Sequence, residues 1–397
     1  MKPLALEIYG VGTWNRGAEL MTIAVSENIR KRFPGARVAV SPWFGSFESR
    51  GHYNLHTVFE DGVSGPWHGR WRLKAARAAL GFLSPGSLPG FGMMLPKEVD
   101  VVLDASGFAF SDQWGPDPAR RLLRKMEASV YRGKPLFLLP QALGPFRKPE
   151  VANACRRLFS RADWMAARDN DSLGHVRGLG SYSNLRLYPD FTSSIHGLGN
   201  FSGKLPSPYV AVVPNARILD KTAQGQSYLE FLVQVAGYLD QRGHHPVFVI
   251  HDEFQDKEIF NQVQARAGRP WICVDHKDPR VLKTILGGAS FVIGSRFHAL
   301  ISALSQSVPC LGIGWSHKYE TLFHEFGIQQ CLLRDFSTWS NVEPVLAKMM
   351  TEQGRKNCSK TIHLAANKQR QLTENMWVEL CDLIEKKTGK KPNHHLA

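Results

Sequence analysis

Residues 294–318 read GSRFHALISALSQSVPCLGIGWSHK, and this stretch decides which fold the sequence predicts. The apolar run that ends at Ile293 has the composition of a buried strand, and residues 298–304 have helical composition. The run after Pro309 predicts a second buried strand. A strand, a helix and a further strand in this order are typical of a parallel sheet covered by helices.

Basic and titratable side chains follow both of these strands. Arg296 and His298 come at the change from strand to helix, and Lys318 follows the second strand. We expect them to lie close together, because the carboxyl ends of neighbouring parallel strands open at the same edge of a sheet. An Arg can hold an oxyanion bidentately and a His can transfer a proton near neutral pH. The pattern therefore predicts an anion site, although a surface ion pair beside a hydrogen-bonded histidine is the alternative for Arg296 and His298 alone.

Length and composition limit the class of protein. The 397 residues, 43% of them hydrophobic, suffice for two domains with their own cores and exclude a disordered chain. The formal charge of +14 favours an anionic partner: a phosphorylated metabolite, an acidic glycan, a membrane surface or nucleic acid. Six cysteines without metal-ligand spacing predict free thiols in a reducing compartment. The apolar run before Gly10 is too short for a signal peptide or a spanning helix, so the expected location is cytoplasmic, or at most a membrane face.

Strand and helix patterns alternate along the chain and predict an α/β fold with two Rossmann-like domains that face a central crevice. The expected division is an N-terminal domain at 1–195, a linker at 196–207, a C-terminal domain at 208–368 and a helix with a tail at 369–397 that returns to the first domain. Strands are expected at 4–9, 36–41, 99–103, 135–139, 164–168, 185–189, 209–213 and 247–250, and helices at 18–33, 342–350 and 368–387.

The loop at 10–17 follows the first predicted strand and contains three glycines. Their spacing is not GxGxxG, so the loop does not predict a dinucleotide site. Asn15 and Glu19 are candidates for holding a substrate. A turn with an ordinary helix N-cap is an equally good interpretation of this loop.

Polar side chains at further strand ends are also candidates. Asp104 follows one strand and Gln141 the next, and a carboxylate in such a place accepts a sugar hydroxyl, acts as a base or caps a helix. Arg168 has the same position as Arg296, with an ion pair to Asp169 or Asp171 as the alternative. Arg217 comes just beyond the first strand of the second domain.

Two other patterns have a weaker connection with function. Residues 67–83 resemble a basic amphipathic helix, which is suited either to an anionic membrane face or to the flank of a core. His251 is followed by two acidic residues, but no further ligands stand at a plausible spacing. We therefore expect no metal site.

Seven short strings, taken in their order along the chain, resemble the polysaccharide pyruvyl transferase family. The strings are GTWNRGAEL, PQALGPF, ARDNDSL, YPDF, PNAR, GSRFHALISAL and GIGWSHKYE. They extend over roughly residues 8–325, and their order is more specific than any single string. The resemblance implies a two-domain architecture similar to that of GT-B-like glycosyltransferases, and the transfer of pyruvate from phosphoenolpyruvate onto sugar hydroxyls.

The resemblance also implies roles for individual residues. His298 and Arg296 take catalytic roles, and no redox cofactor or metal is implied. By the resemblance, Arg168 and Lys318 bind the donor. From their places after strands, Arg217 is also expected to bind the donor, and Asn15, Glu19, Asp104 and Gln141 are expected to bind the acceptor. Ala18 stands where the family often has Asp, and DASGFAF has one glycine where two or three are usual; both loops are expected to touch the acceptor.

The expected chemistry agrees with these residue types. Phosphoenolpyruvate carries a carboxylate and a phosphate, which require converging cations. His298 would protonate the methylene carbon or the departing phosphate, after which two hydroxyls of a free or lipid-linked sugar acceptor close a cyclic ketal.

A nucleotide-sugar-dependent glycosyltransferase is the main alternative, since the same crevice would hold a diphosphate. A non-enzymatic protein that binds an anionic polymer is a further one, but the dispersed basic residues lack the aromatic motifs of nucleic-acid-binding modules, so no nucleic acid is expected.

Overall fold

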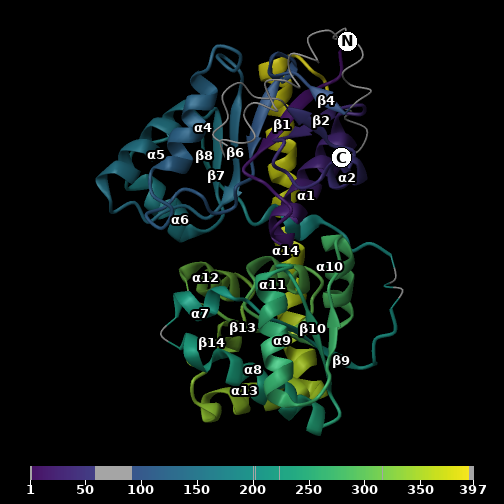
Figure 1. Cartoon of the computed structure of the whole chain (residues 1–397). Helices are drawn as coiled ribbons and strands as arrows, with labels where there is room; N and C mark the ends of the chain where they lie inside the picture. Colours follow the sequence, from purple (N-terminus) through teal and green to yellow (C-terminus); the bar gives the residue numbers. More distant parts are fainter. Residues whose placement is uncertain are drawn as a thin grey trace.

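The computed structural model describes residues 2–58, 92–199, 201, 203–222, 224–314 and 316–392. These residues form two parallel sheets, one in each of two domains, drawn in purple to blue and in green in Figure 1. The predicted α/β fold with two Rossmann-like domains is confirmed. The segment 67–83, for which a membrane contact was an alternative, lies outside the described residues.

The first sheet has eight strands in the order β4-β3-β2-β1-β5-β6-β7-β8. All neighbouring strands are parallel, and β1 lies between β2 and β5. The strands are β1 Ala5–Tyr9, β2 Arg37–Val40, β3 His56–Val58, β4 Met93–Met94, β5 Val101–Asp104, β6 Leu136–Gln141, β7 Trp164–Ala167 and β8 Leu185–Leu187.

The second sheet has six parallel strands in the order β11-β10-β9-β12-β13-β14. Numbered from its own first strand, this is the order 3-2-1-4-5-6 of dinucleotide-binding folds. The strands are β9 Tyr209–Val213, β10 His245–Val249, β11 Ile272–Val274, β12 Val292–Gly294, β13 Cys310–Ile313 and β14 Leu332–Leu333.

Helices join the strands and cover the sheets (Figure 1). The first domain has α1 Arg16–Arg32, α2 Phe47–His52, α4 Asp117–Glu127, α5 Pro149–Arg161 and α6 Asn170–Arg177, with 3-10 turns η2 Pro96–Glu98 and η3 Phe191–Ser194. The second has α7 Arg217–Lys221, α8 Tyr228–Gln241, α9 Gln255–Ala267, α10 Pro279–Gly288, α11 Phe297–Leu304, α12 His317–Glu325 and α13 Trp339–Met350, with η4 Gly225–Ser227 and η5 Gln329–Cys331. The last helix is α14 Glu352–Thr388.

The strands are apolar because the sheets are covered on both faces. Every residue of β5, β6, β7 and β9 is buried, as expected for parallel strands between two layers of helices. Buried apolar side chains form one cluster around the second sheet and two around the first. These cores hold the strand ends, and therefore the loops that follow them, in fixed positions.

The helix α14 belongs to both domains. Its first half places Cys358, Ile362 and Ala366 in the core of the second domain, and its second half places Trp377 and Leu380 in that of the first. Figure 1 shows it in yellow, running alongside both sheets. The sequence predicted a helix from residue 368, but the helix begins at Glu352, because Thr351 caps it by accepting a hydrogen bond from the Gly354 amide.

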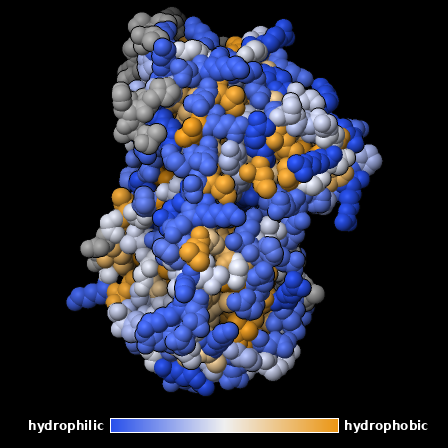
Figure 2. Space-filling model, turned by 180° about the vertical axis from the view of Figure 1, so that it is seen from behind, coloured by the Kyte–Doolittle hydropathy of each residue, from blue (hydrophilic) through white to orange (hydrophobic). Residues whose placement is uncertain are grey.

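The order of the strands reverses direction beside β1 in the first sheet and beside β9 in the second. Loops at such switch points form the ligand crevice of open α/β sheets. Among the described residues, no helix is long and apolar enough to cross a membrane. On the face of the molecule seen in Figure 2, hydrophilic residues cover most of the surface and hydrophobic residues form separate patches.

Candidate functional site

Asp190 lies at the centre of the contact between the domains. It is buried just after β8, and its Oδ2 atom lies 3.2 Å from Arg168 NH1 and 3.5 Å from Nε2 of His298 in the second domain. Its other oxygen accepts hydrogen bonds from the backbone and hydroxyl of Thr192. Burial raises the pKa of Asp190, but His298, Arg168 and Thr192 together outweigh it and hold the pKa well below its usual range.

Arg168 follows β7 and is also buried. The sequence left open an ion pair with Asp169 or Asp171, but the partner is Asp190. The guanidinium also lies 4.1 Å from the ring centroid of Phe297 in the second domain, a cation–π distance. Arg168 is therefore fixed from both domains.

His298 lies between the first turn of α1 and Asp190. A Cβ atom on Gly17 would lie 2.3 Å from Nδ1 of the imidazole, so only a glycine lets α1 approach it this closely. The opposite ring nitrogen faces Asp190. A carboxylate in this position orients an imidazole.

Arg296 is the N-cap residue of α11, and carboxylates hold its guanidinium. Asp256 accepts from Nε at 2.8 Å and from NH2 at 2.5 Å, and Asp252 lies 3.4 Å away. Buried Asp256 also accepts from the Ala216 amide. The arrangement is a bidentate ion pair in the protein interior rather than the surface pair that was the alternative.

Hydrogen bonds from three neighbouring elements hold the loop before Arg296 in place. The backbone oxygen of Ser295 accepts from Asn215 Nδ2 at 2.7 Å and from the Tyr319 hydroxyl at 2.8 Å. The Tyr228 hydroxyl lies 3.1 Å from the Ser295 hydroxyl. Within the sequence PNAR, Asn215 is thus the residue that supports the loop before Arg296.

Lys318, in the first turn of α12, brings a third cation to the site. Its ammonium lies 5.5 Å from the ring centroid of Phe297, 5.4 Å from that of Phe108 and 5.3 Å from that of Tyr319. Burial and the nearby Arg168 and Arg296 lower the pKa of Lys318 to about 7. Because Phe108 belongs to the loop after β5, Lys318 also touches the first domain.

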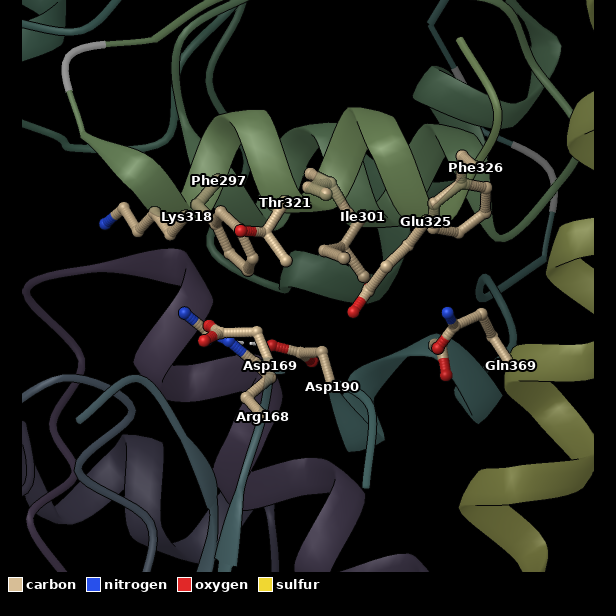
Figure 3. Close-up of a pocket in the computed structure, with 12 residues that line it drawn as sticks. Arg168, Asp169, Asp190, Phe297, Ile301, Lys318, Thr321, Glu325, Phe326 and Gln369 are labelled. Atoms are coloured by element: carbon tan, nitrogen blue, oxygen red, sulfur yellow. Dashed lines mark hydrogen bonds and ion pairs between the residues drawn. The ribbon is translucent and has the colours of Figure 1, made fainter. Parts of the chain in front are cut away.

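A narrow pocket lies behind these residues, and α12 and α14 close it (Figure 3). Arg168 and Asp190 extend into it from the first domain, while Glu325 points into it from the second. Burial is the main cause that raises the pKa of Glu325 to about 7, with a further contribution from Asp169. The pocket therefore has a cationic end at Lys318 and an acidic end at Glu325.

Lys283 of α10 is a buried lysine at the same interface. Its ammonium donates to the Thr192 carbonyl at 3.1 Å, two residues after Asp190. Burial lowers the pKa of Lys283 to about 7, and the negative charge of Asp190 partly opposes this effect. A cation of the second domain thus supports the turn that carries the central carboxylate of the first.

The predicted acceptor residues Asp104 and Gln141 lie together, but both are buried. Gln141 Nε2 donates to Asp104 Oδ2 at 2.7 Å, and the Ser106 hydroxyl donates to the other carboxylate oxygen at 2.5 Å. Burial raises the pKa of Asp104 to about 6. These contacts hold the loops after β5 and β6.

The predicted residues of the first loop are also engaged within the first domain. Asn15 is the N-cap of α1 and accepts from the Gly17 amide at 2.8 Å. Glu19 is buried and accepts from Arg16 at 3.1 Å and from the Tyr53 hydroxyl at 2.8 Å. The interpretation of this loop as a turn with an N-cap describes the contact of Asn15.

Arg217 is the predicted donor residue that the described contacts do not bring to the site. It is exposed at the start of α7 and pairs with Asp220 of the same turn at 3.4 Å. Its donor role stays a prediction.

Sequence reasoning named Asp190 only as part of YPDF and did not propose Asp256 or Lys283. Asp190 had the same signal as Arg168, a polar residue just after a predicted strand. Lys283 had a weaker signal, since it shares a helix with the buried Leu282 and Ile285. Asp256 had none, because its partner is distant in the sequence.

Among the described residues, His251 is not part of a group of metal-ligating side chains. It is buried, and burial together with Arg296 and His298 lowers its pKa to about 3, so the imidazole is neutral. Within the described ranges, no group of three or more His, Cys, Asp or Glu side chains is arranged to hold a metal ion. The carbonyl of His251 instead accepts from the Arg16 amide at 3.2 Å, a contact between the domains.

Solved structures with this architecture include enzymes of nucleotide-sugar metabolism. The S. aureus MnaA–UDP structure has a TM-score of 0.61 and 10% identity, with 99% of both chains covered. A putative UDP-N-acetylglucosamine 2-epimerase from Listeria monocytogenes has a TM-score of 0.60 and 11% identity, covering 98% of this chain and 99% of the other. At such identities the similarity concerns the fold alone.

Sequence comparison gives a more specific result. The chain is 20% identical over 259 residues to the amylovoran biosynthesis protein AmsJ of Erwinia amylovora, a match that covers 59% of this chain and 61% of that protein. The pattern of the polysaccharide pyruvyl transferase family matches residues 15–317, which include Arg168, Asp190, Arg296 and His298 and end just before Lys318. With this match over most of its length, the chain belongs to the polysaccharide pyruvyl transferase family.

Proposed function

We propose that this protein transfers pyruvate from phosphoenolpyruvate to two hydroxyls of a sugar in a polysaccharide or its precursor, forming a cyclic ketal. The observation that carries the proposal is the convergence of Arg168, Asp190, His298 and Lys318 across the two domains. Family membership and the similarity to a protein of amylovoran biosynthesis support it.

The cations suit the donor. Arg168 and Lys318 both lie against the ring of Phe297, close enough to act on one small dianion. A carboxylate and a phosphate on a three-carbon frame require such converging positive charge. Arg296 differs from them, because Asp256 and Asp252 already hold its guanidinium; in this proposal it fixes the turn that presents His298.

His298 supplies the proton transfer. In the first half of the reaction, a sugar hydroxyl adds to C2 of the enol while the protonated imidazole gives its proton to the methylene carbon, and the hydroxyl proton returns to the ring. In the second half, another hydroxyl attacks C2, and phosphate leaves with the electron pair of its C–O bond and with that hydroxyl's proton. Asp190 holds the imidazole in place for both halves.

The reaction is redox-neutral, so the proposal includes no nicotinamide or flavin. Incubation with phosphoenolpyruvate and a panel of sugars tests it, with phosphate release and product mass as readouts. We expect release that depends on the acceptor and a product heavier by one pyruvyl ketal. Thermal stabilisation by a nucleotide sugar but not by phosphoenolpyruvate, with transfer of the sugar, would instead show a glycosyltransferase.

A further inference from the structure

Three of the side chains that were expected to hold the acceptor are engaged with partners inside the first domain. Glu19, Asp104 and Gln141 are buried, and each is bonded to neighbours within the first domain. A sugar chain that enters from solvent must therefore meet other groups at the mouth of the crevice.

Four large aromatic side chains are exposed on the connections that follow strands β1, β2 and β10. Trp14 is 62% exposed, Trp43 44%, Phe47 71% and Phe254 78%. The first three follow β1 and β2 in the first domain, and Phe254 follows β10 in the second. We call these four residues the aromatic rim.

The loop after β1 touches both of the other loops of the aromatic rim. A Cβ atom on Gly45 would lie 2.6 Å from the Thr13 hydroxyl, so the loops after β1 and β2 are in contact. Arg16 donates its amide to the His251 carbonyl at 3.2 Å and pairs with Glu253 at 3.7 Å, which joins the loops after β1 and β10. The rim is thus continuous across the two domains.

The aromatic rim is also continuous with the candidate site. Trp14 stands three residues before Gly17, which packs against the imidazole of His298. Asp252 pairs with Arg296 at 3.4 Å, and its carboxylate also accepts from the Phe254 amide at 3.3 Å. Trp14 of the first domain is therefore close in the chain to a residue that contacts His298. The backbone of Phe254 in the second domain bonds to a carboxylate that contacts Arg296.

The loops are held before any ligand binds. Arg50 NH1 donates to the carbonyls of Pro42, Phe44 and Gly45 at 3.1, 3.1 and 2.9 Å, which fixes the loop that carries Trp43. The ring of Trp14 lies against Gly12, where a Cβ atom would come within 2.0 Å of it. Rigid rings lose little conformational entropy when they bind a ligand.

From these contacts we infer that the aromatic rim is a binding site for several consecutive sugar units of a carbohydrate acceptor, which stack on the rings and lead one unit to His298. The inference rests on the proposed function and extends it to the class of acceptor, an oligosaccharide or a longer chain rather than a free monosaccharide. Flat aromatic faces match the flat C–H faces of sugar rings and leave the hydroxyls in water. Because the rim crosses both domains, a chain bound on it would contact both of them.

The charges beside the rings favour a glycan over a lipid surface. Exposed Glu48 follows Phe47, and exposed Glu253, which also pairs with Arg16, precedes Phe254. Carboxylates at these places repel anionic headgroups but accept hydrogen bonds from sugar hydroxyls.

The test is direct calorimetric binding of β-linked galactotetraose and glucotetraose, each compared with its monosaccharide, to the full chain without donor. We expect the parent to bind at least one tetrasaccharide more tightly than its monosaccharide. Trp14→Leu and Phe254→Leu, which keep apolar bulk but lose the flat ring, should each weaken that binding by about 3- to 10-fold. Trp14→Phe, Phe254→Tyr and the control Leu364→Ala, an exposed apolar side chain on α14, should retain it.

Equal parental affinity for tetrasaccharides and monosaccharides, or Leu variants that bind like the parent, would overturn the inference. The inference would also be overturned if the Leu variants no longer bound phosphatidylglycerol vesicles but kept the parental affinity for the tetrasaccharide. Because binding is measured without phosphoenolpyruvate, these outcomes are independent of whether the protein turns that donor over. Where turnover is seen, the Leu variants should raise the KM for the acceptor and leave that for phosphoenolpyruvate unchanged.

Discussion

Asp190 of the first domain and His298 of the second are joined by a contact of 3.5 Å between Oδ2 and Nε2. The same carboxylate oxygen lies 3.2 Å from Arg168. One buried anion therefore sets the positions of the proposed proton-transfer group and of a proposed donor ligand. The site exists only when the two domains are in contact, which is where sugar chain and donor would meet.

Asp190→Asn should lower kcat/KM for phosphoenolpyruvate by about 100-fold or more, because the imidazole loses its charged partner. The variant should also lose about 3 kcal/mol in free energy of unfolding, since Arg168 stays buried without its counterion. Phosphate release and urea unfolding measure the two effects. Asp335→Asn, at an exposed carboxylate, serves as the control, and a parental rate in Asp190→Asn would contradict the role of this carboxylate.

Gly17→Ala should reduce kcat by about 100-fold while the protein stays folded. The new methyl group would lie 2.3 Å from His298 Nδ1 and must displace the imidazole, whereas alanine itself favours the helix. Gly237→Ala in α8, where a Cβ atom meets nothing within 4 Å, is the matched control. If both variants turned over substrate at the parental rate, the proposed place of the imidazole during the reaction would be wrong.

The pH dependence of donor binding should follow Lys318. Its ammonium form attracts the donor, and because its pKa is lowered to about 7, that form is lost as the pH rises through 7. The KM for phosphoenolpyruvate should therefore rise between pH 7 and 9 by up to about tenfold per unit in the parent. Lys318→Arg keeps its charge over this range, so its KM for phosphoenolpyruvate should rise less with pH. The donor itself also titrates, and dividing the KM of the parent by that of the variant at each pH removes this shared effect. Parallel profiles would exclude this role.

Lys283 should make stability depend on pH in the alkaline range. Its pKa is about 7 in the folded protein and 10.5 for an unperturbed lysine, so between these values the unfolded chain binds more protons than the folded one. The contribution of Lys283 to the free energy of unfolding should thus rise with pH in this window, by up to about 1.4 kcal/mol per unit. Lys283→Met should lack that rise in urea unfolding at pH 7, 8, 9 and 10. An identical slope in the variant would show that Lys283 is charged in the fold.

The fold and part of the site follow from local patterns. Apolar runs gave the strands, and polar residues after them gave Arg168, Arg296, His298 and Lys318, because the ends of parallel strands share one edge. These patterns do not show which partner a side chain at a strand end will meet. Asp104 and Gln141 stand at strand ends and bond to each other within the first domain. Arg168 also stands at a strand end, yet it contacts Phe297 of the second domain, and the sequence shows no difference between these residues.

Partners that are distant in the chain were also beyond sequence reasoning. Asp256 meets Arg296 only because β10 and β12 flank β9, and Lys283 meets Thr192 only because the two domains touch. The early start of α14 was missed because the buried positions of its first half include small side chains, such as Gly354 and Ala366, in a largely polar sequence. Packing against the second domain stabilises the helix there.

The most direct test of this account compares the parent with His298→Gln in phosphate release from phosphoenolpyruvate, with a competent sugar acceptor and mass analysis of the product. We expect acceptor-dependent release and a pyruvyl ketal with the parent, and a rate at least about 100-fold lower with His298→Gln. Near-parental turnover by His298→Gln, or no release by the parent with any acceptor, would contradict it.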